Sequence, residues 1–204
     1  MENRIVTVIG GARSGKSTFA QNLAEKLDKT TVYIATAHNK DGEMAERILK
    51  HQESRPTTWK TVEAPYDLAT AIRESGSEAE VIVVDCVTLF LSNLLLRGLG
   101  DLGTADDPQL PPHLEQDLLV AVKEVVRAAQ DVSALVIFVS NEVGWGIVPL
   151  YHSARVYRDV VGRANQLLAA ASSKVFHVQA GIPIELKSQE VSVDQLCEEL
   201  KHGR

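Results

Sequence analysis

The sequence predicts an α/β fold, in which a mostly parallel β-sheet is covered by helices on both faces. Two observations support this prediction. Short runs such as residues 4–10 and 80–86 are rich in valine and isoleucine at successive positions, which is typical of strands buried on both faces. Longer segments such as residues 114–130, with apolar residues at helical spacing, alternate with these runs along the chain. Strands that alternate with helices pair in parallel through crossover connections.

The elements can be assigned in order along the chain. Strands are expected at residues 4–10, 30–37, 80–86, 134–140 and 174–181, with a short further piece at 59–64. Helices are expected at residues 16–27, 41–55, 67–76, 87–97, 114–130 and 153–172, and a last helix at Ser192, where Gln195 would complete a capping box. Residues 98–113 combine glycines, acids and three prolines, which predicts a mobile surface loop.

Length and composition are those of one globular domain spanning residues 1–204. Apolar residues make up 45% and charged residues 24%, and 21 basic against 27 acidic residues give a net charge of −6, which argues against nucleic-acid binding as the main role. The longest apolar segment, residues 81–96, carries Asp85 and Asn93, so no membrane span is expected. With no signal-peptide pattern, and with Cys86 and Cys197 as free thiols, we expect a cytoplasmic protein.

The segment Gly10–Ser17, GGARSGKS, matches the phosphate-binding pattern G-x-x-x-x-G-K-[ST] between a predicted strand and a predicted helix. Glycines allow the backbone N–H groups to converge on phosphate oxygens, and the helix N-terminus adds its dipole. Lys16 would bind the β- and γ-phosphates, and the Ser17 hydroxyl would bind Mg²⁺. The pattern in this context predicts a P-loop NTPase domain with a RecA-like sheet.

Ligands of such sheets bind beyond the carboxyl ends of the strands. That edge would carry Gly10, Thr36, Asp85, Asn141 and Gly181. Asp85, at the end of a buried strand, is the expected second ligand of Mg²⁺. Ser140, just before Asn141, is also expected on this rim, where a polar side chain could sense the γ-phosphate. No N-K-x-D string marks a guanine site, so the residues alone leave ATP and GTP open as substrates.

His51 is the main candidate for covalent chemistry. It shares a helical stripe with Met44 and Ile48, a pattern that by itself also fits packing. A neutral imidazole is a good nucleophile toward phosphorus, and Arg47 and Arg55, one turn to either side, could flank a bound phosphate.

Several stretches occur together and in order: GGARSGKS, YIATA, DGEMAERILKHQESRP, VVDCVTLFLSN and SNEVGWGIVP. In these the chain resembles the bifunctional adenosylcobinamide kinase / adenosylcobinamide-phosphate guanylyltransferase family of cobalamin biosynthesis. The resemblance implies phosphorylation of adenosylcobinamide by a nucleoside triphosphate. It further implies transfer of GMP from GTP, through a guanylylated histidine, to the phosphorylated product, giving adenosylcobinamide-GDP.

The resemblance also implies roles for individual residues. The nucleophilic histidine falls on His51. The nucleotide-contacting positions fall on Gly10, Gly11, Ala12, Arg13, Ser14, Gly15, Lys16, Ser17, Thr36, Ala37, His38, Gln52, Glu53, Ser54, Arg55, Glu63 and Asp85. A homo-oligomer, a trimer by resemblance, is implied as well. His152 and His177 are expected to be structural or incidental.

Two other functions remain open on the residues alone. The first is a P-loop kinase for a small molecule that performs no nucleotidyl transfer, which would leave His51 without a purpose. The second is an NTP-dependent RecA-like switch module whose output is a partner interaction. If the protein is incubated with GTP and no acceptor, only the transferase is expected to become covalently linked to the nucleotide.

Overall fold

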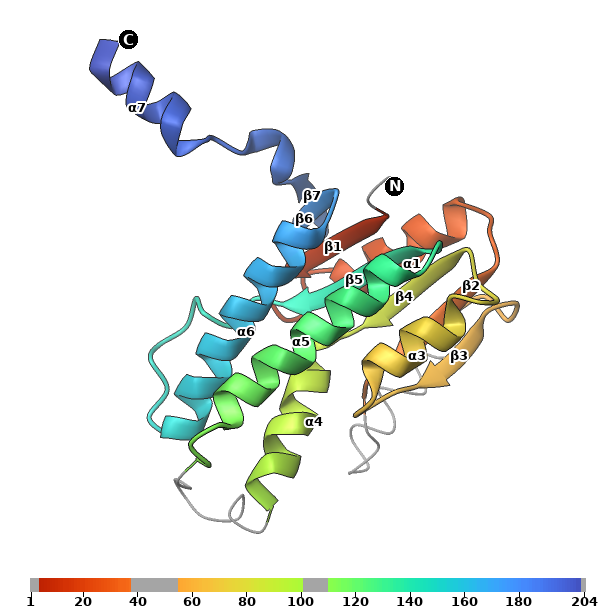
Figure 1. The fold of residues 1–204 in the computed structure, drawn as a ribbon. Helices are drawn as coiled ribbons and strands as arrows, with labels where there is room; N and C mark the ends of the chain where they lie inside the picture. Colours follow the sequence, from red (N-terminus) through yellow and green to blue (C-terminus); the bar gives the residue numbers. More distant parts are fainter. Residues whose placement is uncertain (1–3, 38–54, 101–109, 203–204) are drawn as a thin grey trace.

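The structure is a computed structural model that describes residues 4–37, 55–100 and 110–202. In this part of the chain seven strands form one sheet in the order β3-β2-β4-β5-β1-β6-β7 (Figure 1). The strands are β1 (Ile5–Gly10), β2 (Thr31–Ala35), β3 (Lys60–Glu63), β4 (Val81–Asp85), β5 (Leu135–Asn141), β6 (Lys174–Gln179) and β7 (Ile182–Glu185). All neighbouring strands are parallel except β6 and β7, so the predicted mostly parallel sheet is confirmed.

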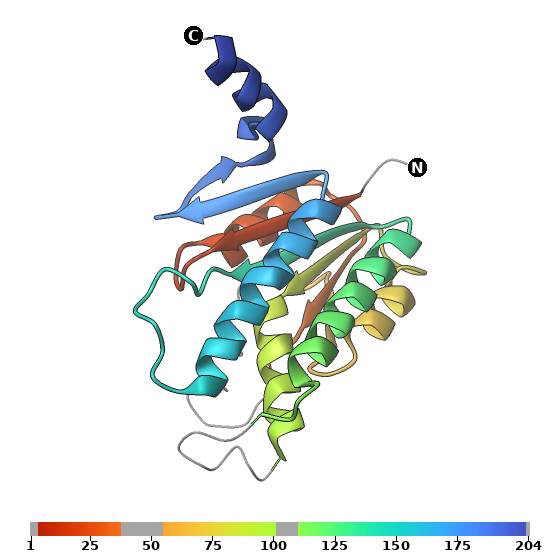
Figure 2. The ribbon, with the colours of Figure 1, turned by 60° about the vertical axis from the view of Figure 1, so that its left-hand side comes forward.

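Side chains alternate between two cores, one on each face of the sheet. In β2, for example, Val32 and Ile34 belong to one core, and Tyr33 and Ala35 to the other. Helices α3, α4, α5 and α6 cover the first core and α1 covers the second, as Figure 2 shows. The helices are α1 (Lys16–Lys26), α3 (Leu68–Ser75), α4 (Val87–Leu99), α5 (Leu114–Asp131), α6 (His152–Ala171) and α7 (Val193–His202). The prediction of helices on both faces is therefore correct.

The parallel strands bring their carboxyl ends to one edge of the sheet. Gly10 of β1 lies opposite Asn141 of β5, and Ala35 of β2 lies opposite both Asp85 of β4 and Glu63 of β3. The residues that follow these positions therefore share the rim predicted for ligand binding.

The short piece expected at 59–64 contains β3, which pairs with β2 at the edge of the sheet. The helix expected at 41–55 lies outside the described residues, apart from Arg55. The structure differs from the predicted elements in two places. The hairpin strand β7 was not predicted. Helix α4 continues into the segment predicted as a loop, because Gly98 packs against α5: a Cβ on Gly98 would lie 2.5 Å from Cδ1 of Leu114. The loop prediction was thus wrong for its first two residues, and residues 101–109 lie outside the described chain.

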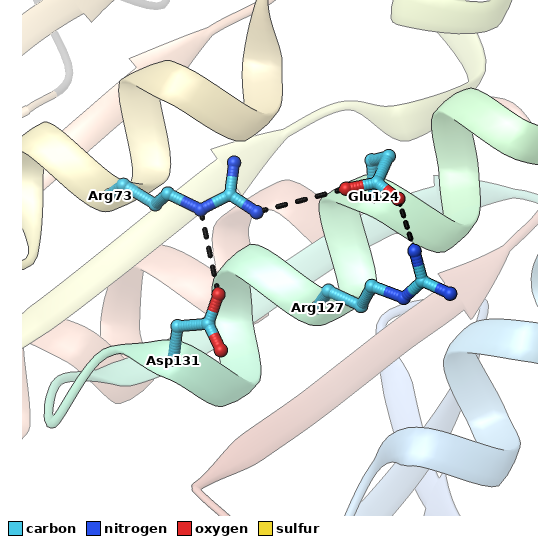
Figure 3. Close-up of polar contacts among 4 residues, drawn as sticks. All are labelled: Arg73, Glu124, Arg127 and Asp131. Atoms are coloured by element: carbon cyan, nitrogen blue, oxygen red, sulfur yellow. Dashed lines mark hydrogen bonds and ion pairs between the residues drawn. The ribbon is translucent and has the colours of Figure 1, made fainter.

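Helices α3 and α5 are also linked by ion pairs on the surface. Nη2 of Arg73 lies 3.8 Å from Oε2 of Glu124, and its Nε lies 3.5 Å from Oδ2 of Asp131 (Figure 3). Arg127 pairs with the same Glu124 within α5. These side chains are largely exposed, so the pairs contribute little stability beside the apolar contacts beneath them.

The chain ends in a helix that stands away from the sheet. Helix α7 buries none of its residues and projects from the body after the 3₁₀ turn Lys187–Gln189 (Figures 1 and 2). Its N-terminus has the predicted capping box: Ser192 Oγ accepts from the N–H of Gln195 at 3.1 Å, and Gln195 Oε1 accepts from the N–H of Ser192 at 3.3 Å. Among the described helices, none is both long and apolar enough to cross a membrane.

Candidate functional site

The predicted phosphate loop joins β1 to α1, and two of its glycines are required by its geometry. Gly15 has φ 96°, a left-handed conformation that suits glycine. A Cβ on Gly10 would lie 2.4 Å from the carbonyl oxygen of Val178 and 2.6 Å from Oγ of Ser14. Only glycine fits at that position without moving the neighbouring strand β6.

Lys16 begins α1, as predicted, and its amine is held inside the loop. Nζ donates a hydrogen bond of 3.1 Å to the carbonyl oxygen of Gly11, and the residue is buried. Burial lowers the pKa of Lys16 from its ordinary value, while Cys86 and Asp85 act in the opposite direction. A bound phosphate would add negative charge beside this amine and favour its protonated form.

Asp85 is oriented by a side chain from the neighbouring strand. The hydroxyl of Tyr33 donates a 2.8 Å hydrogen bond to Oδ2 of Asp85. Burial, followed by the charge of Asp85, raises the pKa of Tyr33, so this hydroxyl remains a donor. This contact could not be predicted from the sequence, because Tyr33 lies in an apolar strand like its neighbours.

Arg55, which precedes β3, contacts the side chain of Tyr33. Its guanidinium carbon lies 3.6 Å from the centroid of the Tyr33 ring, which is a cation–π contact. Nη1 donates to Oγ1 of Thr61 at 3.3 Å, whereas the buried Nε has no hydrogen-bond partner among the described residues. Tyr33 therefore links Arg55, a predicted nucleotide-binding residue, to Asp85, the predicted metal ligand.

Thr36 lies on the rim as predicted, but its side chain is committed to the scaffold. Its hydroxyl donates to the carbonyl oxygen of Cys86 at 2.7 Å and accepts from the N–H of Cys86 at 2.8 Å. Its own carbonyl oxygen accepts from Nδ2 of Asn93 at 2.8 Å. These bonds hold the ends of β2 and β4 together beside Asp85.

The end of β5 is similarly tied to helices α4 and α6. Asn141 donates through Nδ2 to Oγ1 of Thr88 at 2.7 Å. Ser140 was expected to face the ligand, but it is fully buried and donates to Oδ1 of Asn165 at 2.6 Å. That expectation was wrong because alternate residues of a strand point to opposite faces, and Ser140 points under α6.

Other predicted positions fall at the rim or outside the described chain. Ala37 follows Thr36, and the exposed Glu63 ends β3 next to Ala35. Six predicted residues lie in the stretch that the structure does not describe: His38, Arg47, His51, Gln52, Glu53 and Ser54.

The side chains that could hold a metal here are oxygen donors. Ser17 supplies a hydroxyl in the first turn of α1. Asp85 supplies a carboxylate, one oxygen of which accepts the hydrogen bond from Tyr33. Hydroxyl and carboxylate oxygens suit Mg²⁺, which commonly combines one or two such ligands with water and phosphate oxygens. Within residues 4–37, 55–100 and 110–202, no three histidine, cysteine or acidic side chains gather into a metal cluster.

One pair of rings near the phosphate loop was missed by sequence reasoning. Trp145 stacks on His177 with ring centroids 5.4 Å apart and planes inclined by 23°. His177 was expected to be structural or incidental, since nothing in the sequence indicates that a residue of β6 contacts the segment after β5.

Comparison with known proteins identifies the family to which these features belong. Residues 6–186 match the family described as cobinamide kinase / cobinamide phosphate guanyltransferase. The chain belongs to this family. Its membership confirms the resemblance inferred from the motifs, and the matched stretch contains every predicted site residue.

Proteins from three bacteria match this chain over nearly their full length. The bifunctional adenosylcobalamin biosynthesis protein CobU of Escherichia coli is 40% identical over 90% of this chain and 99% of that protein. CobU of Salmonella typhimurium is 38% identical over the same shares, and CobP of Pseudomonas aeruginosa is 39% identical over 89% of this chain and 96% of that protein.

A solved structure supports the fold independently. An ATPase from the type III secretion system of pathogenic bacteria superposes with a TM-score of 0.54 and 11% identity. The likeness covers 98% of this chain and 62% of that one. At this identity the likeness concerns the fold alone, and it agrees with the predicted P-loop NTPase architecture.

Proposed function

We propose that the chain phosphorylates adenosylcobinamide with a nucleoside triphosphate, ATP or GTP, and then transfers GMP from GTP to the adenosylcobinamide phosphate. The observation that carries the proposal is that the buried Lys16 of the phosphate loop and Asp85 at the end of β4 lie on the same rim of the sheet, in a chain that belongs to the cobinamide kinase / guanyltransferase family. A buried amine and a carboxylate at this rim are the charges that a metal-bound triphosphate needs.

In the kinase reaction, the phosphate loop from Gly10 to Ser17 would bind the triphosphate. Its N–H groups and Lys16 would neutralise the β- and γ-phosphates, and Ser17 and Asp85 would hold Mg²⁺. The metal would supply charge neutralisation between the phosphates. The hydroxyl oxygen of adenosylcobinamide would attack the γ-phosphorus, the bridging P–O bond would break with its electron pair going to the departing nucleoside diphosphate, and the hydroxyl proton would pass to solvent.

In the second reaction, His51 would act as the nucleophile. An imidazole nitrogen attacks the α-phosphorus of GTP, and pyrophosphate leaves with the electron pair of the broken P–O bond. A phosphate oxygen of adenosylcobinamide phosphate then attacks the same phosphorus and frees the histidine. Arg55, which lies against Tyr33 at this edge of the sheet, would stabilise the charge on the phosphates.

The remaining contacts to the nucleotide are proposed from the family resemblance. Thr36, Ala37 and Glu63 lie together at the ends of β2 and β3, and would contribute backbone groups or a carboxylate on that flank. The same resemblance assigns nucleotide contacts to His38, Gln52, Glu53 and Ser54.

We further propose that the protein works in the cytoplasm as a homo-oligomer, by resemblance a trimer. Exposed apolar side chains on the C-terminal part of the chain, including Ile182, Ile184, Leu196 and Leu200, are compatible with contacts between copies. A monomer by light scattering at micromolar concentration would contradict this proposal.

The experiment that tests the two reactions uses GTP labelled at different phosphorus atoms. With α-labelled GTP and Mg²⁺ but no acceptor, the protein should gain one covalent GMP. With γ-labelled nucleotide and adenosylcobinamide, the label should appear in the corrinoid. Label transfer to the corrinoid without covalent GMP would indicate a small-molecule kinase only, and hydrolysis with neither product would indicate a switch module.

A further inference from the structure

A cavity lies beside the phosphate loop, on the side away from Asp85. Its volume is about 310 Å³, at the lower end of the range of small-molecule sites. Residues 11–14 of the loop form one wall, and Glu142, Trp145, His177 and Gln179 contribute to the others. Outside the loop itself, the cavity contains none of the residues to which the proposed function assigns a contact.

The direction of a bound triphosphate follows from the strand order. If Lys16 and Ser17 hold the β- and γ-phosphates and Asp85 holds the metal between them, the γ-phosphate lies toward β4. In the sheet, β1 lies between β5 and β6, and β4 lies beyond β5. In the phosphoryl donor of the kinase reaction, the α-phosphate and the nucleoside would therefore leave the loop toward β6, where the cavity lies, and away from the β2 and β3 flank that the second reaction would use.

The ring pair at the cavity is suited to a nucleobase. Trp145 stacks on His177, yet 76% of its surface is exposed, so most of the indole is open to a further flat ring. His177 is paired in register with Ile9 of β1, one residue before the loop begins, which anchors the ring pair. A base stacked on an aromatic side chain gains affinity without needing a specific hydrogen-bond pattern.

The walls of the cavity are fastened to the phosphate loop. The N–H of Gly181, in the β6–β7 turn, donates to the carbonyl oxygen of Ser14 at 2.8 Å. The N–H of Glu142 donates to the carbonyl oxygen of Gly10 at 2.9 Å, and its Oε1 accepts from the N–H of Gly144 at the same distance. The segment that carries Trp145 is thus tied to the loop that would bind the phosphates.

We propose that this cavity binds the purine base of the nucleoside triphosphate that donates the phosphoryl group in the kinase reaction, with the base stacked on Trp145. The carboxylate of Glu142 offers an acceptor to an amino or imino group of a purine. The proposal rests on the proposed kinase function for its substrate, but the cavity and the ring pair are independent of that function.

The test compares a nucleotide with a ligand that has phosphates and no base. Trp145→Ala is expected to raise the KM for ATP in the kinase reaction, and the Kd for ATP by calorimetry, by about tenfold or more. The affinity for inorganic tripolyphosphate should not change. Trp145→Phe, which keeps a ring, should retain most of the affinity for ATP. Ile147→Ala is the matched control, because Ile147 is 96% exposed on the same segment and does not line the cavity.

The outcomes separate the two proposals. An unchanged Kd for ATP in a folded Trp145→Ala variant would overturn the base site, as would an equal loss of affinity for ATP and tripolyphosphate. Should the unaltered protein show no kinase turnover, the proposed function fails, while the two Kd values still decide whether the base site exists. A selective loss of ATP affinity in Trp145→Ala supports the site in either case.

Discussion

Tyr33 and Asp85, on neighbouring parallel strands, are joined by a 2.8 Å hydrogen bond from the Tyr33 hydroxyl to Oδ2 of the carboxylate. Since a hydrogen-bonded partner orients a metal-binding carboxylate, Tyr33→Phe should raise the Mg²⁺ concentration needed for half-maximal kinase activity by about tenfold. Asp85→Asn should raise it further and slow both reactions. Mg²⁺ titrations measure this, and an unchanged titration in Asp85→Asn would mean that Asp85 merely ends its strand.

Lys16→Ala should abolish both reactions, because both require a triphosphate bound by the same loop. Loss of one charged group that stabilises a transition state lowers kcat by about 10²–10³. Kinase and guanylylation assays measure this, with Lys26→Ala as the control, since Lys26 is exposed at the other end of the same helix. Kinase turnover near that of the unaltered protein would rule out a shared site.

His51→Ala should lose the guanylylated intermediate while it keeps much of the kinase activity. Phosphoryl transfer to a hydroxyl needs positioning and charge neutralisation, whereas nucleotidyl transfer through the enzyme needs a nucleophile, which alanine lacks. Intact mass after incubation with GTP and Mg²⁺ measures the guanylylated intermediate, and phosphorylation of adenosylcobinamide measures the kinase activity.

His113→Ala, at an exposed position before α5, controls for the loss of a histidine. A His51→Ala variant that still gains one GMP would exclude His51 as the nucleophile. Loss of both activities, with unchanged thermal melting, would instead indicate that His51 helps to bind the triphosphate.

The two cysteines should differ sharply in reactivity. Burial, followed by the charge of Asp85, raises the pKa of Cys86 to about 11, whereas Cys197 is exposed. The thiolate is the reactive form, so iodoacetamide at about pH 8 should label one cysteine in the folded protein and two after denaturation. Cys197→Ser should remove the labelling of the folded protein, and rapid labelling of Cys86 in that variant would contradict the buried, neutral thiol.

Helices α3 and α5 provide a comparison between surface charge and core packing. Arg73→Ala removes two exposed ion pairs and should lower the free energy of unfolding by at most about 1 kcal/mol. Ile72→Ala, at a fully buried neighbouring position, should lower it by about 2–5 kcal/mol. Urea denaturation of both variants measures the difference, and a larger loss in Arg73→Ala would contradict this ranking.

Several features could be predicted from the sequence because they depend on local patterns. The phosphate loop is a contiguous motif between a strand and a helix, and the capping box at Ser192 spans four residues. Asp85 could be placed on the rim because it ends a strand that is apolar on both faces, and parallel strands share one edge for their carboxyl ends. A local pattern misled at Gly98. Glycine there suggested a loop, but in the structure it allows α4 to pack closely against Leu114.

The order of the strands was decided only by the tertiary structure. An alternating pattern of strands and helices predicts parallel pairing, but it does not say which strands become neighbours, since crossover connections can lead to either side of the first strand. Here β1 lies between β5 and β6, which brings Trp145 and His177 together beside the phosphate loop. Likewise, β2 beside β4 places Tyr33 between Asp85 and Arg55. Such contacts join residues far apart in sequence, so they stabilise the protein only once the sheet has formed.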